Sequence, residues 1–347
     1  MACSRGVMVA VVALCVASLT LAGCGGKPEV TSPWPVANAE RTVPKPTEPL
    51  RWPLTGLPAP DQAAITKRPF SIKIENSPQA RPQSGLNSAD VVYETVTEGG
   101  ITRFNCIFQS TVPQLVGPVR SARLSDTWIV PQYNALFFYS GASNSVNSAV
   151  KSAKLPNLSQ DAGVAAPYTR SSQRSAPHNL YLDSKKAYAE AMKRGMPVSV
   201  KVLRLQHAPK SAESSNAVSS VTIPFSTANT AEWTYDSSRK VYLRKNNGKV
   251  HSDGVTSKQV AAKNVVVMWV KYTRVGRDKV GSTTYRVELG GSGRASVFRD
   301  GKRYDGTWTA TRTSPPRFKA SNGETIRLAP GNTWFQVVSL NTNISMR

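Results

Sequence analysis

Two alternating segments joined by a pair of glycines restrict the fold of this chain more than any other feature. Residues 88–98 (SADVVYETVTE) and 101–109 (ITRFNCIFQ) each alternate apolar and polar side chains, a pattern typical of β-strands with one buried face. The Gly99-Gly100 pair between them predicts a two-residue hairpin turn, which places Glu98 opposite Ile101. The chain is therefore expected to contain an antiparallel sheet.

This predicted register assigns the hairpin side chains to two faces. The apolar face would carry Val91, Tyr93, Thr95, Phe104, Cys106 and Phe108, and the polar face Asp90, Glu94, Glu98, Arg103, Asn105 and Gln109. Cys106 is then interpreted as a core residue rather than a nucleophile. Glu94 and Glu98 flank Arg103, so the polar face is either a solvated surface with ion pairs or one wall of a pocket with a carboxylate available as base or metal ligand.

Residues 116–128 (VGPVRSARLSDTW) contain a second constraint. Gly117-Pro118 indicates a turn, and a helix is expected to begin at or just after Ser121. Arg120 and Arg123 are three residues apart and would share one face near that helix start, where free N–H groups already favour an anion. Two guanidiniums placed in this way could together bind a phosphate, carboxylate or sulfate group. In the alternative interpretation, Arg120 pairs with a structural carboxylate and Arg123 pairs with Asp126.

A second polar run occupies residues 167–181 (PYTRSSQRSAPHNLY), where Arg170, Arg174, His178 and Asn179 lie close together in sequence. The two arginines would share a face only if the run were helical. His178 follows a proline in a predicted loop beside these arginines, and both a structural and a functional role remain open for it.

The order of elements predicts an α+β or α/β chain. A strand over 69–76, the hairpin, the arginine helix and a buried strand within 134–143 indicate a mixed sheet with helices. The small-residue loop at 140–143 would lie at a strand's carboxyl end, where α/β sheets hold ligands. Beyond residue 221 the pattern changes to short strands separated by turn signals such as Asn247-Gly248 and Asp300-Gly301. We therefore expect an N-terminal α/β domain over 54–207, a linker over 208–221 and a β-rich domain over 222–347.

The N-terminus indicates export. Residues 1–23 combine an early arginine with an apolar run and small residues, as in a signal peptide. Leu21-Ala22-Gly23-Cys24 resembles the lipobox of bacterial lipoproteins, which implies lipid on the Cys24 thiol and anchoring to the outer face of the cytoplasmic membrane. Residues 24–53 are proline-rich and predict an extended tether. After processing, Cys106 has no partner within the chain, so no intrachain disulfide is expected.

The composition of the chain and the motifs that it lacks limit the classes of binding partner and cofactor that we expect. The formal net charge is +23, and in an exported protein this favours anionic wall polymers or lipid headgroups over nucleic acid. The sequence contains no P-loop, HExxH, CxxC pair or GxSxG. No cofactor is identified, and a divalent metal beside Glu94 and Glu98 stays open.

Several strings resemble one known family, the YerB-like bacterial lipoproteins with a domain of unknown function 3048. They are SADVVYETVTEGGITRF, GPVRSAR, the APHNLY run, and the C-terminal NVVV, GSGRASVFRDG and GNTWFQVV segments. The resemblance covers about residues 54–340 and implies a lipoprotein with an N-terminal and a C-terminal domain. The family's biochemistry is uncharacterised, so the resemblance implies no reaction.

Three classes of function follow from the residues. The leading hypothesis is binding of an anionic envelope ligand by Arg120, Arg123, Arg170 and Arg174, with His178 and Asn179 orienting it and Glu94, Glu98 and Arg103 opposite. The first alternative is an envelope hydrolase or transferase acting on a phosphodiester or glycosidic bond, with Glu94 or His178 as general base. The second is a scaffold for wall-synthesis proteins that uses the basic C-terminal surface.

Overall fold

A computed structural model describes residues 48–211, 215–277 and 283–347. The predicted signal peptide, Cys24 and most of the predicted tether lie outside these residues. Folded structure begins slightly before the expected residue 54. The Ala59 N–H donates to the Leu50 carbonyl (2.8 Å), and the backbones of Arg51 and Pro58 form an isolated β-bridge. None of the helices in the described part of the chain has the length and apolarity that a membrane crossing requires.

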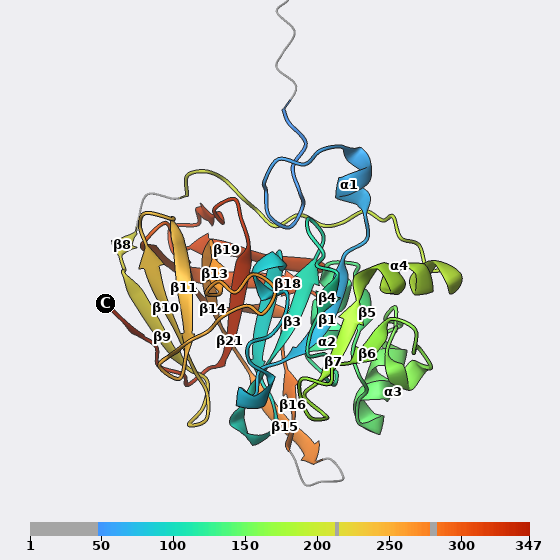
Figure 1. The fold of residues 1–347 in the computed structure, drawn as a ribbon. Helices are drawn as coiled ribbons and strands as arrows, with labels where there is room; N and C mark the ends of the chain where they lie inside the picture. The colour runs from blue at the N-terminus through green and yellow to red at the C-terminus, as the bar shows by residue number, and fades with distance from the viewer. Residues whose placement is uncertain (1–47, 212–214, 278–282) are drawn as a thin grey trace, which may run out of the picture. The chain divides into compact units, whose positions relative to one another are not determined.

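An eleven-stranded mixed sheet forms the centre of residues 48–347 (Figure 1). In spatial order its strands are β20 (Thr325–Ile326), β19 (Ser314–Ala320), β18 (Lys302–Thr311), β17 (Gly291–Arg299), β14 (Asn264–Val270), β21 (Thr333–Ser339), β2 (Val91–Val96), β3 (Thr102–Phe108), β1 (Phe70–Glu75) and β5 (Leu136–Phe138), with β8 (Asn216–Ala217) beside β18. The predicted combination of a mixed sheet with a β-rich C-terminal region is confirmed.

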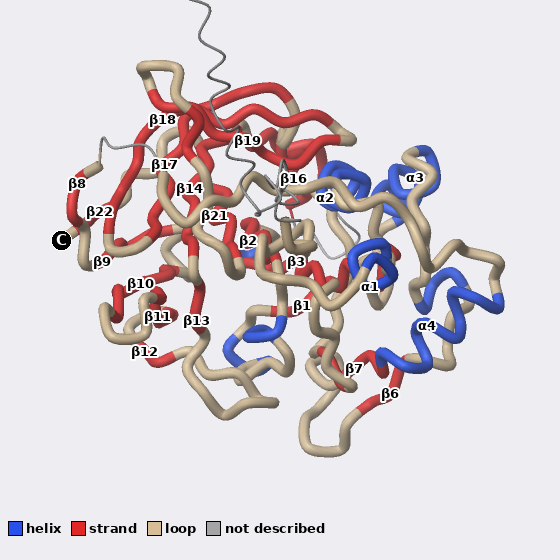
Figure 2. The backbone as a smooth tube through the Cα atoms, turned by 90° about the horizontal axis from the view of Figure 1, so that it is seen from above, coloured by secondary structure: helices blue, strands red, loops and turns tan. Residues whose placement is uncertain are grey.

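Smaller elements surround this sheet. A six-stranded sheet contains β12 (Lys249–Val250), β11 (Val241–Asn246), β10 (Thr230–Asp236), β9 (Ser220–Pro224), β22 (Ser345–Met346) and β13 (Ala261–Ala262). Two further sheets are β4 (Leu115–Val116) with β7 (Leu180–Asp183) and β6 (Tyr168–Arg170), and β15 (Tyr272–Arg277) with β16 (Thr283–Val287). The α-helices are α1 (Gln62–Thr66), α2 (Asp126–Gln132), α3 (Asn144–Ser152) and α4 (Ser184–Lys193), and the 3₁₀ turns are η1 (Pro78–Ala80), η2 (Leu86–Ser88), η3 (Glu98–Gly100) and η4 (Gln160–Ala162). Figure 2 shows α1, α2, α3 and α4 on the side of the molecule that holds β1 and β7, while the opposite side is built mainly of strands.

The central sheet joins the two predicted domains. Strand β21, from the C-terminal part of the chain, lies parallel to both β14 and β2, so Thr333 is in register with Asn264 on one side and with Val91 on the other. Residues Glu48–Arg347 accordingly form one compact unit. The change of sequence pattern near residue 221 marks a boundary between halves that share a sheet.

Apolar side chains are buried on both faces of this sheet. On one face, Phe104 and Trp233 each pack edge-on against Trp334 at 5.2 Å between ring centroids, which fixes the six-stranded sheet against the central one. On the other face, α2 and α3 bury Ile129 and Val146 in a second core. Burial on both faces explains why β14 (NVVVMWV) reads as a nearly continuous apolar run.

The predicted hairpin exists, but its predicted register was wrong by one residue. The Thr97 N–H donates to the Ile101 carbonyl (2.8 Å), so three residues, Glu98–Gly100, form the loop where two were expected. Glu94 is therefore opposite Phe104, and Thr95 is opposite Arg103. A shift of one residue moves every side chain of a strand to the other face. Glu94 thus shares a face with Cys106, which is fully buried in the core as predicted.

Other local predictions have mixed outcomes. The strand over 69–76 is confirmed as β1, and the left-handed turns at Asn247-Gly248 and Asp300-Gly301 form as expected. The helix predicted from Ser121 instead begins at Asp126. Its expected N-terminal N–H groups are therefore not beside Arg120. The run 167–181 is not helical, since it forms β6 and a loop, so Arg170 and Arg174 do not share a helical face.

Candidate functional site

The GPVRSAR segment runs between the carboxyl ends of β1 and β5 and is held there by backbone hydrogen bonds and isolated β-bridges. The Glu75 N–H donates to Pro118 O (3.0 Å), and the Arg120 N–H donates to Lys73 O (2.9 Å). On the other side, the Ser140 N–H donates to Arg120 O (3.1 Å). A Cβ on Gly117 would lie 2.9 Å from the Leu180 carbonyl oxygen, so only glycine allows this close approach. The backbone therefore places Arg120 at the sheet edge where α/β proteins hold ligands.

Three guanidiniums meet at this edge. Arg103 comes from β3, while Arg120 and Arg123 come from the GPVRSAR segment. Arg120 Nε is 3.5 Å from Glu75 Oε1, Arg103 Nη1 is 3.7 Å from Glu98 Oε2, and Arg123 donates a short hydrogen bond to the same Glu98 oxygen. We call these five residues the arginine cluster. The sequence predicted that Arg103, Arg120, Arg123 and Glu98 would lie together, and the structure brings them together by tertiary packing.

Positive charge exceeds negative charge within this cluster. Burial and, next in size, the nearby charge of Arg123 lower the pKa of Arg103 to about 9, although the charge of Glu98 opposes this shift. Burial would raise the pKa of Glu98, but the hydrogen bond and charge of Arg123 outweigh burial and hold that pKa below its usual value. The Nε atoms of Arg103, Arg120 and Arg123 are buried and find no hydrogen-bond acceptor among the described residues.

A buried ion pair lies next to the arginine cluster and fixes part of its backbone. Lys73 Nζ donates to Asp126 Oδ1 (2.8 Å), and both side chains are fully buried. Asn105 donates to the same oxygen (2.9 Å), and the other Asp126 oxygen accepts the Arg123 backbone N–H (2.7 Å). The carboxylate of Asp126, the first residue of α2, thus accepts a backbone hydrogen bond at the start of its own helix. This contact fixes the backbone that carries Arg123.

His178 lies beside the cluster and contacts its buried carboxylate. Nδ1 is 2.9 and 3.0 Å from the two oxygens of Glu75, whose side chain is 1 % exposed. Ser77 Oγ donates to the same carboxylate (2.9 Å). His178 is thereby held within reach of the group that also contacts Arg120.

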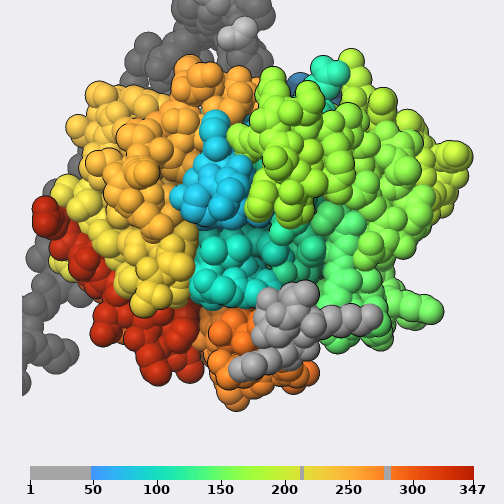
Figure 3. All heavy atoms as spheres, turned by 60° about the horizontal axis from the view of Figure 1, so that its bottom comes forward, coloured from blue at the N-terminus to red at the C-terminus, as the bar shows by residue number. Residues whose placement is uncertain are grey.

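Arg170, Arg174 and Asn179 hold the loop of residues 171–179 in place. Arg170 donates to Asn179 Oδ1 (2.8 Å), while Asn179 Nδ2 donates to the carbonyls of Ser171 (2.9 Å) and Arg174 (3.0 Å). Arg174 donates to the carbonyls of Ala80 and Pro82, the second at 2.8 Å. On the face shown in Figure 3, the lime surface of this part of the chain borders the blue surface of the segment that follows β1. These three side chains contact the chain itself and do not join the three guanidiniums.

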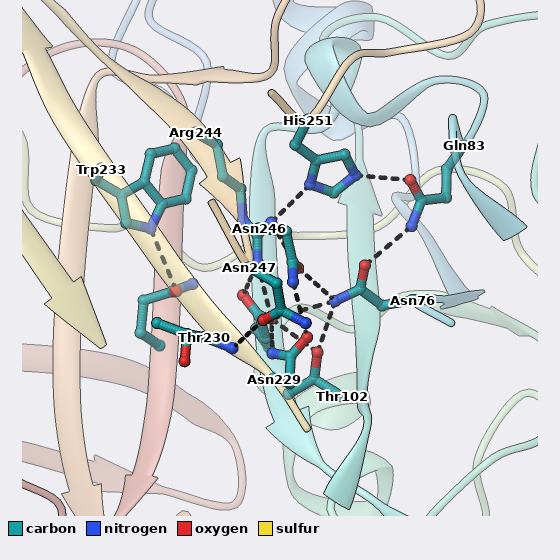
Figure 4. Close-up of polar contacts among 12 residues, drawn as sticks. Asn76, Gln83, Thr102, Asn229, Thr230, Trp233, Arg244, Asn246, Asn247 and His251 are labelled. Atoms are coloured by element: carbon teal, nitrogen blue, oxygen red, sulfur yellow. Dashed lines mark hydrogen bonds and ion pairs between the residues drawn. The ribbon is translucent and has the colours of Figure 1, made fainter. Parts of the chain in front are cut away.

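Glu94 belongs to a separate polar group on the other face of the sheet. Arg244 Nη2 is 2.9 Å from both Glu94 oxygens, and Thr102 Oγ1 donates to one of them (2.7 Å); neither charged side chain is exposed. The group, which we call the Glu94 network, comprises Glu94, Arg244, Thr102, Asn76, Gln83, Asn229, Asn246 and His251. Figure 4 shows His251, Gln83 and Asn76 connected in series within it. Glu94 therefore does not form the predicted wall with Glu98 and Arg103, because the one-residue shift points it away from them.

Comparison with known proteins assigns the chain to a family. Models of the N-terminal and C-terminal domains of a protein of unknown function (DUF3048) match residues 54–197 and 221–335. The chain belongs to the DUF3048 family. It is 29 % identical over 299 residues to "Putative lipoprotein YerB" of Bacillus subtilis (strain 168), covering 85 % of this chain and 88 % of that protein. The crystal structure of YerB protein from Bacillus subtilis aligns with a TM-score of 0.75 and 28 % identity over 85 % of this chain and 99 % of that one.

Neither polar group of this DUF3048 chain has the form of a metal centre. Within the described ranges, no cluster of three or more His, Cys, Asp or Glu side chains could hold a metal ion. Glu94 and Glu98, the predicted candidates for a shared metal, contact different arginines in different groups. The acidic groups of the arginine cluster face guanidiniums, which compete with a cation for the same oxygens.

Sequence reasoning missed the residues that hold the DUF3048 site from within. Lys73 and Glu75 lie in a strand whose six residues are all buried. Asp126, which the alternative interpretation named as a partner of Arg123, accepts the backbone N–H of that residue, and its side chain pairs with Lys73. A signal was present, because two opposite charges alternate with apolar residues in FSIKIE. Charged side chains in a buried strand require partners. The identity of those partners depends on segments that are distant in sequence.

Proposed function

We propose that this protein is a lipid-anchored envelope protein that binds an anionic envelope group at the arginine cluster. The name of its Bacillus subtilis relative includes the word lipoprotein, and the Leu21-Ala22-Gly23-Cys24 sequence supports the same anchor here, on the outer face of the cytoplasmic membrane. The ligand would be a wall polymer or lipid headgroup that carries phosphate, carboxylate or sulfate.

One observation carries this proposal: three guanidiniums converge around only two carboxylates. Like charges held close in a desolvated site repel each other, and a bound anion would relieve that repulsion. Arg120 is the residue best placed to receive it. Its side chain is 21 % exposed, and within the described residues no hydrogen bond engages its guanidinium.

Co-sedimentation with isolated envelopes tests the proposal. The mature chain from Cys24, made without lipid, is mixed with wall and membrane fragments across a salt series. Arg120→Gln should weaken binding by about 10-fold to 100-fold, because a charge-assisted hydrogen bond contributes roughly 1.5–3 kcal/mol. Wild-type binding should fall as salt rises.

The matched control is Arg317→Gln, which removes the same charge from an exposed position on β19. It should bind like wild type, and unchanged circular dichroism should show that both variants fold. Equal binding by Arg120→Gln and wild type would refute the arginine cluster as the binding site. Equal losses in both variants would indicate attraction by overall charge alone.

A further inference from the structure

We propose that His178 is a general base and that the site cleaves a phosphodiester bound by Arg120. This inference rests on the proposed anion site and names its ligand class. The observation behind it is that His178 Nδ1 (2.9 Å) and Arg120 Nε (3.5 Å) both contact one oxygen, Oε1, of Glu75. An imidazole and a guanidinium therefore flank the same point at the carboxyl end of β1.

The contact with Glu75 fixes the tautomer of His178. An ionised carboxylate only accepts hydrogen bonds, so Nδ1 must carry the proton that it donates. In the neutral ring, Nε2 is then left with its lone pair, and within the described residues it has no hydrogen-bond partner. The His178 side chain is 24 % exposed, which leaves this nitrogen accessible from solvent. A carboxylate that orients a histidine in this way favours its action as a base.

The surrounding loop is built to hold that orientation. The backbone N–H of His178 donates to Ser175 O (3.0 Å), and the neighbouring Asn179 is bonded on both its oxygen and its nitrogen. Arg174 fastens the loop to the segment that follows β1. The loop around His178 is therefore fixed at three places.

The groups around His178 favour cleavage of a phosphodiester over cleavage of a glycosidic bond. Glycoside hydrolysis uses two carboxyl groups that face the scissile bond. Here each candidate carboxylate is already paired: Glu75 with His178 and Arg120. Glu98 is paired with Arg103 and Arg123, and Glu94 is buried against Arg244. A phosphodiester requires a base for the attacking water and a cation for the non-bridging oxygens. His178 and Arg120 provide these two groups.

The proposed reaction is hydrolysis and requires no redox partner. His178 Nε2 removes a proton from water, and the water oxygen bonds to phosphorus. One ester P–O bond breaks with its electron pair remaining on the leaving oxygen, which takes a proton from solvent on the side opposite the attacking water, and the imidazolium then releases its proton to solvent. A phosphomonoester and an alcohol result, while Arg120 neutralises the non-bridging oxygens. Glu75 acts as a positioning residue, since it touches His178 and not the substrate.

The test uses the unlipidated mature chain with bis(p-nitrophenyl) phosphate for turnover and inorganic phosphate for binding. Wild-type turnover should rise with pH and then level off, as expected for a reaction that requires a deprotonated base. His178→Ala should lose 100-fold or more, in the range expected for a general base, while phosphate binding changes less than threefold. Added imidazole should restore part of the turnover of His178→Ala.

Glu75→Gln should lower turnover about tenfold and shift the pH profile. His207→Asn, which changes a histidine outside the site, should have wild-type turnover.

The outcomes separate the two proposals. Phosphate binding that needs Arg120, without turnover above that of His178→Ala, would overturn the catalytic inference and leave anion binding intact. Loss of turnover in His178→Ala without rescue by imidazole would also overturn it, since that pattern indicates a structural clamp. Failure of wild type to bind phosphate, or binding that is unchanged in Arg120→Gln, would contradict the anion site itself. Ser77→Ala removes one hydrogen bond to Glu75 and replaces Glu75→Gln if the latter does not fold.

Discussion

Arg244 and Glu94 form a fully buried ion pair whose partners lie 150 residues apart in sequence. Arg244 also lies over the rings of Phe104, Trp233 and Trp334 at 5.4–5.6 Å. His251 Nδ1 accepts a hydrogen bond from Arg244 (2.6 Å), and burial followed by the Arg244 charge lowers the pKa of His251 well below its usual value. The imidazole therefore stays neutral, and Arg244 keeps Glu94 as its only ionic partner among the described residues.

Breaking this pair should destabilise the protein strongly. Glu94→Gln and Arg244→Met should each lower the free energy of unfolding by about 3–5 kcal/mol, because each leaves one buried charge without its counter-charge. The double variant should cost less than the sum of the single changes, since it leaves neither charge behind. Urea unfolding monitored by tryptophan fluorescence measures all three. Strict additivity would contradict a direct interaction between the two groups.

At the scale of single elements, the accuracy of the predicted strand pairing depended on whether the turn sequence fixed the length of the loop. The turns predicted at Asn247-Gly248 and Asp300-Gly301 use residues that tolerate positive φ, and each turn joins two paired antiparallel strands. Gly99 and Gly100 also have positive φ, yet they lie in a three-residue loop. A glycine pair fits both loop lengths, so this turn did not fix the register of β2 against β3.

Two turn glycines allow strain and steric contact to be separated. Gly301 has φ +71° and an added Cβ would lie 2.8 Å from the Tyr235 ring, whereas Gly323 has φ +86° and open space around the same position. Gly323→Ala should lower the free energy of unfolding by about 1–2 kcal/mol from left-handed strain alone. Gly301→Ala should lower it by more, because the ring must also move. Thermal unfolding of both variants tests this; equal losses would mean that Tyr235 moves without cost.

For the whole molecule, the decisive feature is the position of β21. This strand completes the central sheet between β2, at residues 91–96, and β14, at residues 264–270. The two regions matched by the DUF3048 models, 54–197 and 221–335, therefore complete each other's sheet. An N-terminal half alone would expose the long edge of β2 and the apolar faces of Phe104 and Cys106.

The N-terminal half should consequently fail to fold by itself. A fragment of residues 48–207 is expected to give no cooperative transition in urea, while the mature chain gives a single one. Circular dichroism and limited proteolysis compare the two proteins. Mixing the fragment with residues 208–347 should restore a cooperative transition. A cooperative transition for the isolated fragment would contradict the shared sheet as the source of stability.

The sequence alone determined the local features whose causes are local. Alternation predicted β1 and the paired strands β2 and β3, turn residues predicted the turns at Asn247-Gly248 and Asp300-Gly301, and the apolar setting of Cys106 predicted a core thiol. The arginines of the cluster were identified because charged residues gather there beside turns. These properties depend on neighbours within a few positions along the chain.

Tertiary structure decided which face each side chain occupies and which charges meet. Glu94 was predicted to face Arg103, but the loop adds one residue and directs it to Arg244 in the other half of the chain. Glu75 was not predicted at all, although it is the carboxylate that His178 and Arg120 share. A strand buried on both faces carries no sequence signal for the direction of its side chains, so the partners of its charges are fixed only when the sheet packs.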